Sequence, residues 1–403
     1  MAETLNLGNG NWATKEDSLL AYNSENGNFK PLPFDFTRAS SATVVNKAGL
    51  IETVGSGEPR IDFNNDAKGA LLLEPTRSNL ITYSEDFLSG AWTKESSTIV
   101  ADSSISPDGN LNATKLTSNT SSGLIRASYN SSIGVDHTFS FFIKNDNSLS
   151  SDITIRTSST AVNSTINWTN NVLTSITNGT GVTDFESYGN GWYRVFTSYE
   201  SIEAEQRCKI YASRNGDGAS VYIYGAMIEQ GSYATSYIPT QGQSGGVTRV
   251  ADSISINLPD TDSFNSSNGF SLITEFGAGA AGSGSSSVFL TVNDDTSSTY
   301  MGFTSSSVFR SRLNLSGTAY LNSQGNAPRT QVNSLFISCD SNGWAQGANG
   351  VVNDTGINDA SVFNKVNNIN CVTTESYGII KINKLLIYNT RLSNAELAAL
   401  TSN

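Results

Sequence analysis

Apolar and polar residues alternate along much of the chain from about Ile99 onward, and this two-residue period predicts β-strands. In the segment HTFSFFIK (residues 137–144), the odd-numbered residues share one face and the even-numbered residues share the other. Phe142 interrupts the second face, which is otherwise polar. Asn-Gly dipeptides at residues 178–179, 190–191 and 215–216 readily supply the positive φ angles of tight hairpin turns. The pattern therefore predicts antiparallel β-meanders in the middle of the chain.

The strand pattern is interrupted at residues 238–253, where a proline and a cluster of glycines and glutamines occur. We therefore expect a domain boundary near Val250 and a second β-domain beyond it. One helix is expected near the end of the sequence, because Ser393 and Glu396 form a capping box ahead of Leu397 and Leu400. Further strands of the second domain are predicted at residues 272–276, 288–292, 309–315, 335–337 and 377–388.

The first 76 residues have few apolar side chains outside residues 19–20 and 71–73, so they are not expected to form a core of their own. We interpret them as an extended arm that docks on another part of the protein. The predicted fold class is all-β, with two antiparallel β-sandwich (jelly-roll) domains, a preceding N-terminal arm and a short C-terminal helix. The expected division is residues 1–76 for the arm, 77–250 for the first sandwich and 251–403 for the second.

Acidic residues outnumber basic ones, with 36 Asp and Glu against 24 Lys and Arg and a formal net charge of −12. This charge repels phosphate backbones and anionic lipids, so nucleic acid and membranes are not expected partners. The first residues do not have the pattern of a secretory signal, and no apolar run is long enough to span a bilayer. We therefore expect folding in a cytoplasm, where Cys208, Cys339 and Cys371 should be reduced and mostly buried. Cys339 and Cys371 are the one plausible pair.

Motifs for catalysis or metal binding are scarce. His137 is the single histidine, which excludes a multi-histidine metal site, and we interpret it as an ordinary strand residue. The chain has no ExD triplet, the pattern that carries the carboxylates of concanavalin-A-like glucanases. The segment SCDSNGW (residues 338–344) departs from the spacing of a sialidase Asp-box and is interpreted as a turn. The segment that begins at Asp62 departs from a calcium loop at Ala67 and Leu73. We expect no enzyme activity, no cofactor and no metal site.

Three stretches of the chain resemble a known family. They are FDFTRASSATVVNKAGLIETV (34–54), GALLLEPTRSNLITYSEDF (69–87) with Trp92 shortly after it, and YGAMIEQGSYATSYIPT (224–240) followed by VTRVADSISI (247–256). They resemble bacteriophage virion proteins of the tail-fibre and head-fibre kind. The resemblance implies a jelly roll similar to carbohydrate-binding modules over residues 80–240, with GNGWYRVF (189–196) as its central hairpin. It implies a laminin-G or concanavalin-A-like sandwich in the C-terminal part.

Carbohydrate-binding jelly rolls often hold a structural calcium ion near their first and last strands, and the resemblance would place Glu85 and Glu229 near that position. The alternative is that both are solvated surface carboxylates, and we expect no metal.

Tryptophan side chains are candidates for sugar contacts, because an aromatic ring packs on the apolar side of a pyranose and aromatic residues are enriched at binding sites. Trp168 and Trp344 lie among polar turn residues, where a large ring is less easily buried, and we predict that these two contact glycans. Trp92 and Trp192 lie beside strand-forming residues and are expected in the core.

The sequence favours a non-enzymatic structural protein of a phage virion, such as a tail fibre, head fibre or capsid decoration. Its two lectin-like sandwiches would adhere to host-surface glycans through weak sites that multivalency strengthens. A polysaccharide depolymerase and a spacer without a ligand are the alternatives. The expected partners are host glycans and other virion proteins, which the N-terminal arm would engage within a homo-oligomer, with a trimer favoured. The expected location is the virion surface, after assembly in the bacterial host cytoplasm.

Overall fold

The computed structural model confirms the predicted fold class, because antiparallel sheets make up almost all of the regular structure and one short helix follows them. Contacts divide the chain into two compact units. Unit 1 consists of Met1–Ser41, Val54–Thr76 and Val250–Asn403, and unit 2 of Ala42–Thr53 and Arg77–Arg249. The structure describes residues 5–15, 18–23, 28–121, 123–156, 161–179, 182–213, 216, 218–257, 269–278, 298–303, 308–315, 318–326, 333–340, 342–357, 368–372 and 378–402.

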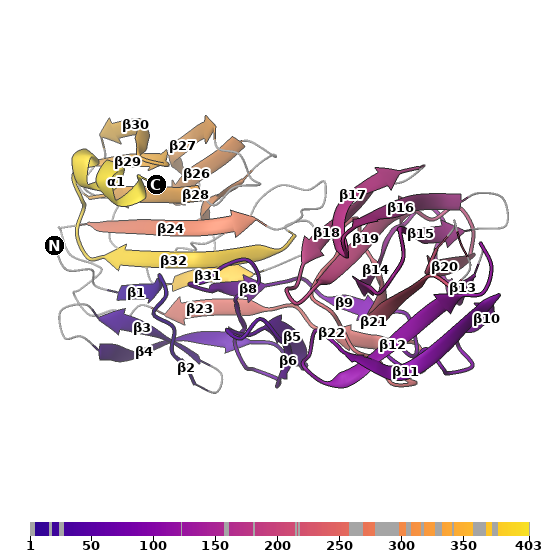
Figure 1. Cartoon of the computed structure of the whole chain (residues 1–403). Coiled ribbons are helices and arrows are strands. Elements are labelled where there is room, and N and C mark those ends of the chain that lie inside the picture. Colours follow the sequence, from indigo (N-terminus) through magenta and orange to yellow (C-terminus); the bar gives the residue numbers. More distant parts are fainter. Residues whose placement is uncertain are drawn as a thin grey trace. The chain divides into compact units, whose positions relative to one another are not determined.

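Unit 2 is built around two six-stranded antiparallel sheets, with the strand orders β10-β13-β20-β15-β16-β17 and β11-β12-β21-β14-β19-β18 (Figure 1). Two short pairs, β5–β6 and β9–β22, accompany them. The strands are β5 (Ala42–Val45), β6 (Ile51–Val54), β9 (Arg77–Asn79), β10 (Thr93–Glu95), β11 (Ser97–Ile105), β12 (Leu111–Ser118), β13 (Leu124–Asn130), β14 (Asp136–Asn145), β15 (Ser150–Arg156), β16 (Ala161–Thr169), β17 (Val172–Asn178), β18 (Val182–Ser187), β19 (Trp192–Glu200), β20 (Glu205–Tyr211), β21 (Ser220–Gln230) and β22 (Val247–Arg249).

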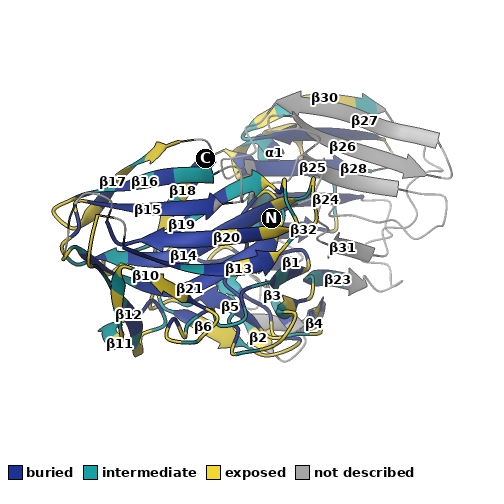
Figure 2. Cartoon of the chain, turned by 90° about the vertical axis from the view of Figure 1, so that its right-hand side faces the viewer, coloured by how far each residue is buried: buried dark blue, intermediate teal, exposed yellow. Residues whose placement is uncertain are grey.

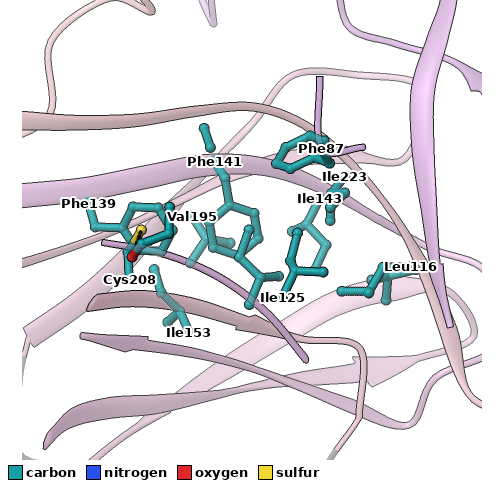
Figure 3. Packing of buried hydrophobic residues seen from close by; sticks show 14 of the residues in the cluster. Phe87, Leu116, Ile125, Phe139, Phe141, Ile143, Ile153, Val195, Cys208 and Ile223 are labelled. Atoms are coloured by element: carbon teal, nitrogen blue, oxygen red, sulfur yellow. Dashed lines mark hydrogen bonds between the residues drawn. The ribbon is translucent and has the colours of Figure 1, made fainter. Parts of the chain in front are cut away.

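The core of unit 2 lies between its two sheets. Phe139, Phe141 and Ile143 of β14 meet Ile153 of β15 and Cys208 of β20 there (Figure 3). The alternation in residues 137–144 thus places the odd-numbered residues inside, as predicted. Phe142 points to the other face of its sheet, where it is fully buried against a second cluster that includes Trp192, Tyr224 and Tyr237. That cluster explains why an apolar residue interrupts the polar face.

The turn at Asn190-Gly191 is a tight hairpin, as the sequence predicted, since both residues have positive φ angles, of 51° and 79°. It joins β18 to β19, and the N–H of Tyr188, the residue after β18, donates to the Trp192 carbonyl at 2.9 Å. Such a turn matches the twist of antiparallel strands. Figure 2 shows that the sandwich strands β13, β14 and β20 are largely buried, while exposed residues concentrate toward the loops and edges.

Unit 1 contains one large antiparallel sheet, with the order β30-β29-β28-β24-β32-β1-β3-β4-β23-β31, and a three-stranded sheet of β25, β26 and β27. The short strands β2, β7 and β8 also belong to the large sheet. The elements are β1 (Leu5–Gly8), β2 (Thr14–Lys15), β3 (Ser18–Asn23), β4 (Asn28–Thr37), β7 (Ile61–Asp62), β8 (Ala70–Leu73), β23 (Ser253–Asn257), β24 (Phe270–Ala278), β25 (Ser298–Phe303), β26 (Val308–Leu315), β27 (Thr318–Asn326), β28 (Asn333–Cys339), β29 (Gly343–Ala348), β30 (Val351–Ile357), β31 (Asn368–Val372), β32 (Ile380–Tyr388) and α1 (Asn394–Thr401).

The expected N-terminal arm is wrong as a separate element. Strands β1, β3 and β4 lie inside the sheet of unit 1, between β32 and β23. Their side chains Leu7, Leu19 and Phe34 are almost fully buried in a core shared with β24, β28 and β32. The few apolar residues of the segment are too sparse for a core of their own, but they suffice when strands from the C-terminal half complete the sheet.

The helix α1 packs on the face of the large sheet that holds Ile273 and Phe336, opposite the face with Leu7 and Leu19. The capping box is confirmed, because the Glu396 backbone N–H bonds the Ser393 hydroxyl and the Glu396 carboxylate accepts from the Ser393 backbone N–H at 2.9 Å. Leu397 is buried beside Ile273 and Phe336, whereas Leu400 is exposed. Leu397 and Thr401 are therefore the buried residues that anchor the helix, and Leu400, the other leucine that follows the capping box, does not.

A buried ion cluster in unit 1 joins segments that are far apart in the sequence. Asp252 pairs with Arg38 at 3.1 Å and with Arg60, and Arg60 also pairs with Glu74 at 2.7 Å. Each of these four residues is at most 2% exposed. Arg38, Glu74 and Asp252 belong to the three stretches that carry the family resemblance, so those stretches contain buried ion pairs of the fold.

Candidate functional site

The two tryptophans predicted from the sequence are both buried. Trp168 is 6% exposed and faces the sandwich interior, where its indole N–H donates to the Ser151 hydroxyl at 3.0 Å. Trp344 is 9% exposed and belongs to the core of unit 1. The premise that polar neighbours keep these rings exposed is wrong, because each lies at an inward-facing position of a strand, β16 or β29. Neither ring offers an open face to a sugar, and the prediction of glycan contact gains no support. Trp92 and Trp192 are buried, as predicted.

Glu85 lies in a half-buried polar cluster of unit 2. Its Oε1 atom accepts a hydrogen bond from the Tyr237 hydroxyl at 2.9 Å and lies 3.2 Å from the Tyr224 hydroxyl. The same Tyr224 hydroxyl lies 3.1 Å from Asp108 Oδ2. Burial raises the pKa of Glu85, whereas hydrogen bonds from Ser106 and Asn110 overcome the burial of Asp108 and lower its pKa. A phenol therefore lies between the two carboxylates.

Glu229 is fully buried, so the reading of it as a solvated surface carboxylate is wrong. Its carboxylate accepts from the Thr235 backbone N–H at 2.8 Å and from the Thr235 hydroxyl at 2.6 Å, and it pairs with Arg77 at 3.5 Å. Burial raises the pKa of Glu229. Groups of three or more metal-ligating side chains do not occur in the described part of the chain.

His137 and two of the cysteines are buried. The imidazole Nδ1 of His137 lies 3.0 Å from the Ser201 hydroxyl, itself buried, and 3.1 Å from the Val135 carbonyl. Cys208 and Cys339 are free and buried, as predicted, while the side chain of Cys371 lies outside the described structure. Among the described residues, no helix is long and apolar enough to cross a membrane.

The most promising surface site lies on the outer face of the β11-β12-β21-β14-β19-β18 sheet. Cross-strand pairing aligns one residue from each of five neighbouring strands in a row, which we call the Tyr222 row. Residues opposite each other in antiparallel strands share a face, with Cβ atoms about 5 Å apart. The row consists of Trp192 on β19, Lys144 on β14, Tyr222 on β21, Lys115 on β12 and Val100 on β11.

Polar contacts hold the centre of the row in place. Lys115 Nζ pairs with Asp146 Oδ2 at 2.7 Å and lies 5.8 Å from the centre of the Tyr222 ring. The Tyr222 hydroxyl donates to Asp146 Oδ1 at 3.3 Å, and the Ser220 hydroxyl donates to Oδ2 at 2.6 Å. The side-chain Oδ1 of Asn147 accepts from the Ser220 backbone N–H at 2.7 Å, which fixes the loop after β14.

The centre of the row remains accessible to solvent. The side chains of Lys115 and Asp146 are 34% and 27% exposed, Tyr222 is half-buried, and Asn147 is exposed. The hydrogen bond to Asp146 raises the pKa of Lys115. Burial alone would raise the pKa of Asp146, but the hydrogen bonds from Lys115 and Ser220 outweigh it and lower the pKa. The cluster therefore presents an aromatic ring, a carboxylate, an ammonium group and an amide, which together can contact both the apolar face and the hydroxyl groups of a sugar.

Sequence reasoning missed this site. Tyr222 alternates with the core residues Val221 and Ile223, so a surface position could have been predicted from the two-residue period. Its neighbours on β12 and β14 could not have been predicted, because they depend on the register between strands that are far apart in the sequence.

Comparisons with known proteins place this chain in no established family. No protein-family model matches the sequence, and no curated protein is significantly similar to it. Similar solved structures include the CBM40 domain of a Ruminococcus gnavus sialidase bound to α2,3-sialyllactose, with 14% identity over 33% of this chain and 82% of that one, and a TM-score of 0.26. The receptor-binding domain of botulinum neurotoxin mosaic serotype C/D has 10% identity over 37% of this chain and 39% of that one, with a TM-score of 0.31.

The binding domain of botulinum neurotoxin DC in complex with rat synaptotagmin II has 12% identity, covers 38% of this chain and 40% of that one, and has a TM-score of 0.30. The chain thus spans about two fifths of these toxin domains. The neighbours are a carbohydrate-binding module and toxin receptor-binding domains. At these TM-scores and identities, the likeness assigns no ligand to this chain.

Proposed function

We propose that the chain is a non-enzymatic structural protein of a phage particle that adheres to host-surface glycans through unit 2. The observation that carries the glycan-binding part is the Tyr222 row, where an aromatic side chain lies beside Asp146, Lys115 and Asn147 on an accessible sheet face. The family resemblance of residues 34–54, 69–87, 224–240 and 247–256 supports the phage assignment.

The chemistry at this site suits a pyranose ring. The apolar face of the sugar would pack on Tyr222, and the Asp146 carboxylate would accept hydrogen bonds from ring hydroxyls. Lys115 and Asn147 would donate to hydroxyl or ring oxygens. The Tyr222 side chain is only partly exposed, so a single site would bind weakly, with Kd on the order of 10⁻³ to 10⁻⁵ M. Several copies on one particle would strengthen binding by about 10² to 10⁴.

A glycan array of bacterial surface polysaccharides tests the proposal, with the protein presented in many copies on beads. Wild-type protein should bind a subset of the polysaccharides, and Tyr222→Ala or Asp146→Asn should reduce that binding at least tenfold. Arg207→Ala is the matched control, because Arg207 forms an exposed ion pair with Glu205 on the other sheet of unit 2. If multivalent wild-type protein binds no polysaccharide, the adhesive role is wrong and the spacer alternative replaces it.

The depolymerase alternative has no support from the carboxylate pair Glu85 and Asp108. Both carboxylates contact the Tyr224 hydroxyl, which occupies the place that a glycosidic oxygen would need. We expect no new reducing ends or unsaturated products when the protein is incubated with polysaccharides that it binds. Turnover that Glu85→Gln abolishes would make the protein an enzyme.

Attachment to the particle through residues 1–76 stays part of the proposal, as does a homo-oligomer with a trimer favoured. Because β1, β3 and β4 are interior strands of unit 1, deleting them would disrupt that unit, and truncation cannot test attachment. Substitutions at exposed positions of the segment, such as Lys47→Glu and Glu58→Lys, are the appropriate test. Incorporation into particles should fall if the segment binds a virion partner, whereas incorporation at the wild-type copy number would place attachment elsewhere.

A further inference from the structure

The Tyr222 row alternates between aromatic and cationic side chains. Tyr222 has Lys144 opposite it on one side and Lys115 on the other, and Trp192 lies opposite Lys144 on the next strand. The Cβ atoms of neighbours in such a row are about 5 Å apart, so the Cβ atoms of the two lysines are about 10 Å apart, with Tyr222 between them. This arrangement places a cation on either side of the one accessible ring.

The two lysines differ in how their charge is balanced. Lys115 pairs with Asp146, which also accepts from the Ser220 and Tyr222 hydroxyls. Lys144 makes no ion pair or side-chain hydrogen bond with any residue that the structure describes. Its side chain is half-buried and its Cε lies close to Gly191, 3.5 Å from the position that a Cβ would take there. The row therefore carries one unbalanced positive charge beside Tyr222.

Lys144 is thus a half-buried lysine without an acidic partner among the described residues, in a protein with a net charge of −12. In the register of β18 and β19, Glu186 lies opposite Arg194 and Asp184 opposite Phe196, and among the described residues neither carboxylate forms an ion pair with Lys144. A bound anion could therefore supply the charge partner that Lys144 lacks on this sheet.

We propose that the Tyr222 row selects acidic saccharides, with the sugar ring on Tyr222 and the sugar carboxylate on Lys144. The inference rests on the proposed glycan-binding function and names its substrate class. A uronic acid fits this geometry, because its carboxylate is attached directly to the ring carbon and projects from the edge of the pyranose. Asp146, two residues after Lys144 and bonded to the Tyr222 hydroxyl, would accept hydrogen bonds from the ring hydroxyls, so the site would bind the carboxylate and the hydroxyl groups of the sugar differently.

The overall negative charge of the protein repels an acidic polymer, so the local attraction at Lys144 must be stronger than this repulsion. Charges separated by more than about 8 Å are largely screened at physiological ionic strength, whereas a direct ammonium–carboxylate contact in a half-buried site is screened much less. The net charge therefore slows the approach of an acidic glycan, mainly at low salt, while Lys144 retains the bound one. Binding should weaken less between 0.15 and 0.5 M salt than a purely electrostatic attraction would.

A matched pair of ligands tests the inference. The probes are a trisaccharide of galacturonic acid and the same trisaccharide after reduction of its carboxylates to hydroxymethyl groups. We expect the acidic form to bind wild-type protein about 10- to 100-fold more tightly than the neutral form, the range for a hydrogen bond to a charged group. Lys144→Met should remove this preference, so that the acidic and neutral forms bind with similar affinity, and Lys144→Arg should restore most of it.

Two further variants separate this inference from the proposed function. Tyr222→Ala should weaken both trisaccharides, because it removes the surface on which either ring would pack. Lys94→Met, on the exposed strand β10 of the other sheet, is the matched control for loss of one positive charge and should change neither affinity. Equal binding of the two trisaccharides, or an equal loss in Lys144→Met and Lys94→Met, would overturn acidic selectivity. If glycan binding is weakened by Tyr222→Ala but not by Lys144→Met, the proposed glycan-binding function stands and the proposed selectivity for acidic saccharides is wrong.

Discussion

The buried ion cluster of unit 1 allows a sharp prediction, in which Asp252→Asn removes one charge without changing the size of the side chain. In the native protein, Asp252 pairs with Arg38 and Arg60 and also accepts from the Glu74 backbone N–H at 2.8 Å. The substitution leaves two buried guanidinium groups with Glu74 as the remaining carboxylate of the cluster. Breaking a buried pair in this way costs about 3–5 kcal/mol. We expect the free energy of unfolding of unit 1 to fall by this amount.

Hydrogen exchange measures the effect unit by unit, which matters because a chain with two units need not unfold in one step. Amide protons of β8 and β32 should exchange about two to four orders of magnitude faster in Asp252→Asn, whereas those of β14 and β21 in unit 2 should not change. Glu95→Gln is the control. The Glu95 side chain, which pairs with Arg126, is 42% exposed, so loss of this ion pair should lower the free energy of unfolding by at most about 1 kcal/mol. A loss below 1 kcal/mol for Asp252→Asn would refute the reasoning.

Three further predictions concern single buried side chains of unit 2. Trp168→Ala should destabilise the unit by about 3–5 kcal/mol in urea unfolding, and a loss of glycan binding without this destabilisation would restore Trp168 as a direct contact. Burial lowers the pKa of His137 in the folded state, so the unfolded state binds its proton at higher pH. Stability should therefore be constant above about pH 7 and fall as the pH drops through about 6.5, a decline that His137→Gln should reduce. Burial raises the pKa of Cys208 to about 12, and its thiol should resist alkylation at pH 8 until unit 2 unfolds, as mass spectrometry would detect.

Local sequence signals predicted the local parts of the fold. Asn190-Gly191 has positive φ at both positions, although Asn178-Gly179 does not, and the Ser393–Glu396 capping box satisfies backbone groups within one helical turn. The alternation around Phe139 and Phe141 likewise requires only that one face be buried. Such features depend on a few consecutive residues, so a single sequence contains the information for them.

Long-range pairing could not be predicted in the same way. Leu5 of β1 pairs with Ile387 of β32, and the apolar residues near Leu7 look too few until that partner is known. Trp168 has polar neighbours in the sequence, yet its strand position turns the ring inward toward Ser151. Counting polar neighbours is therefore a poor guide to exposure within a strand, where alternate residues face opposite ways.

Tyr222 and Lys144 illustrate the same limit for the candidate site. They are distant in the sequence and meet because β21 and β14 pair in one particular register. A shift of that register by one residue would turn Tyr222 toward the core and replace it on the surface by Val221 or Ile223. The chemistry of the site is thus a property of the strand pairing as much as of the residues.

The position of β1 between β3 and β32 also has a consequence for how the protein is synthesised. The strands β1, β3 and β4 leave the ribosome long before β23 and β32, the partners that complete their sheet. Most of unit 2, from β9 to β22, is translated as one stretch and can pair as it emerges. A nascent chain from which β22 has just left the ribosome would then carry a largely folded unit 2 together with N-terminal strands that still have open edges. These strands would be the natural binding sites for chaperones until β32 has been translated.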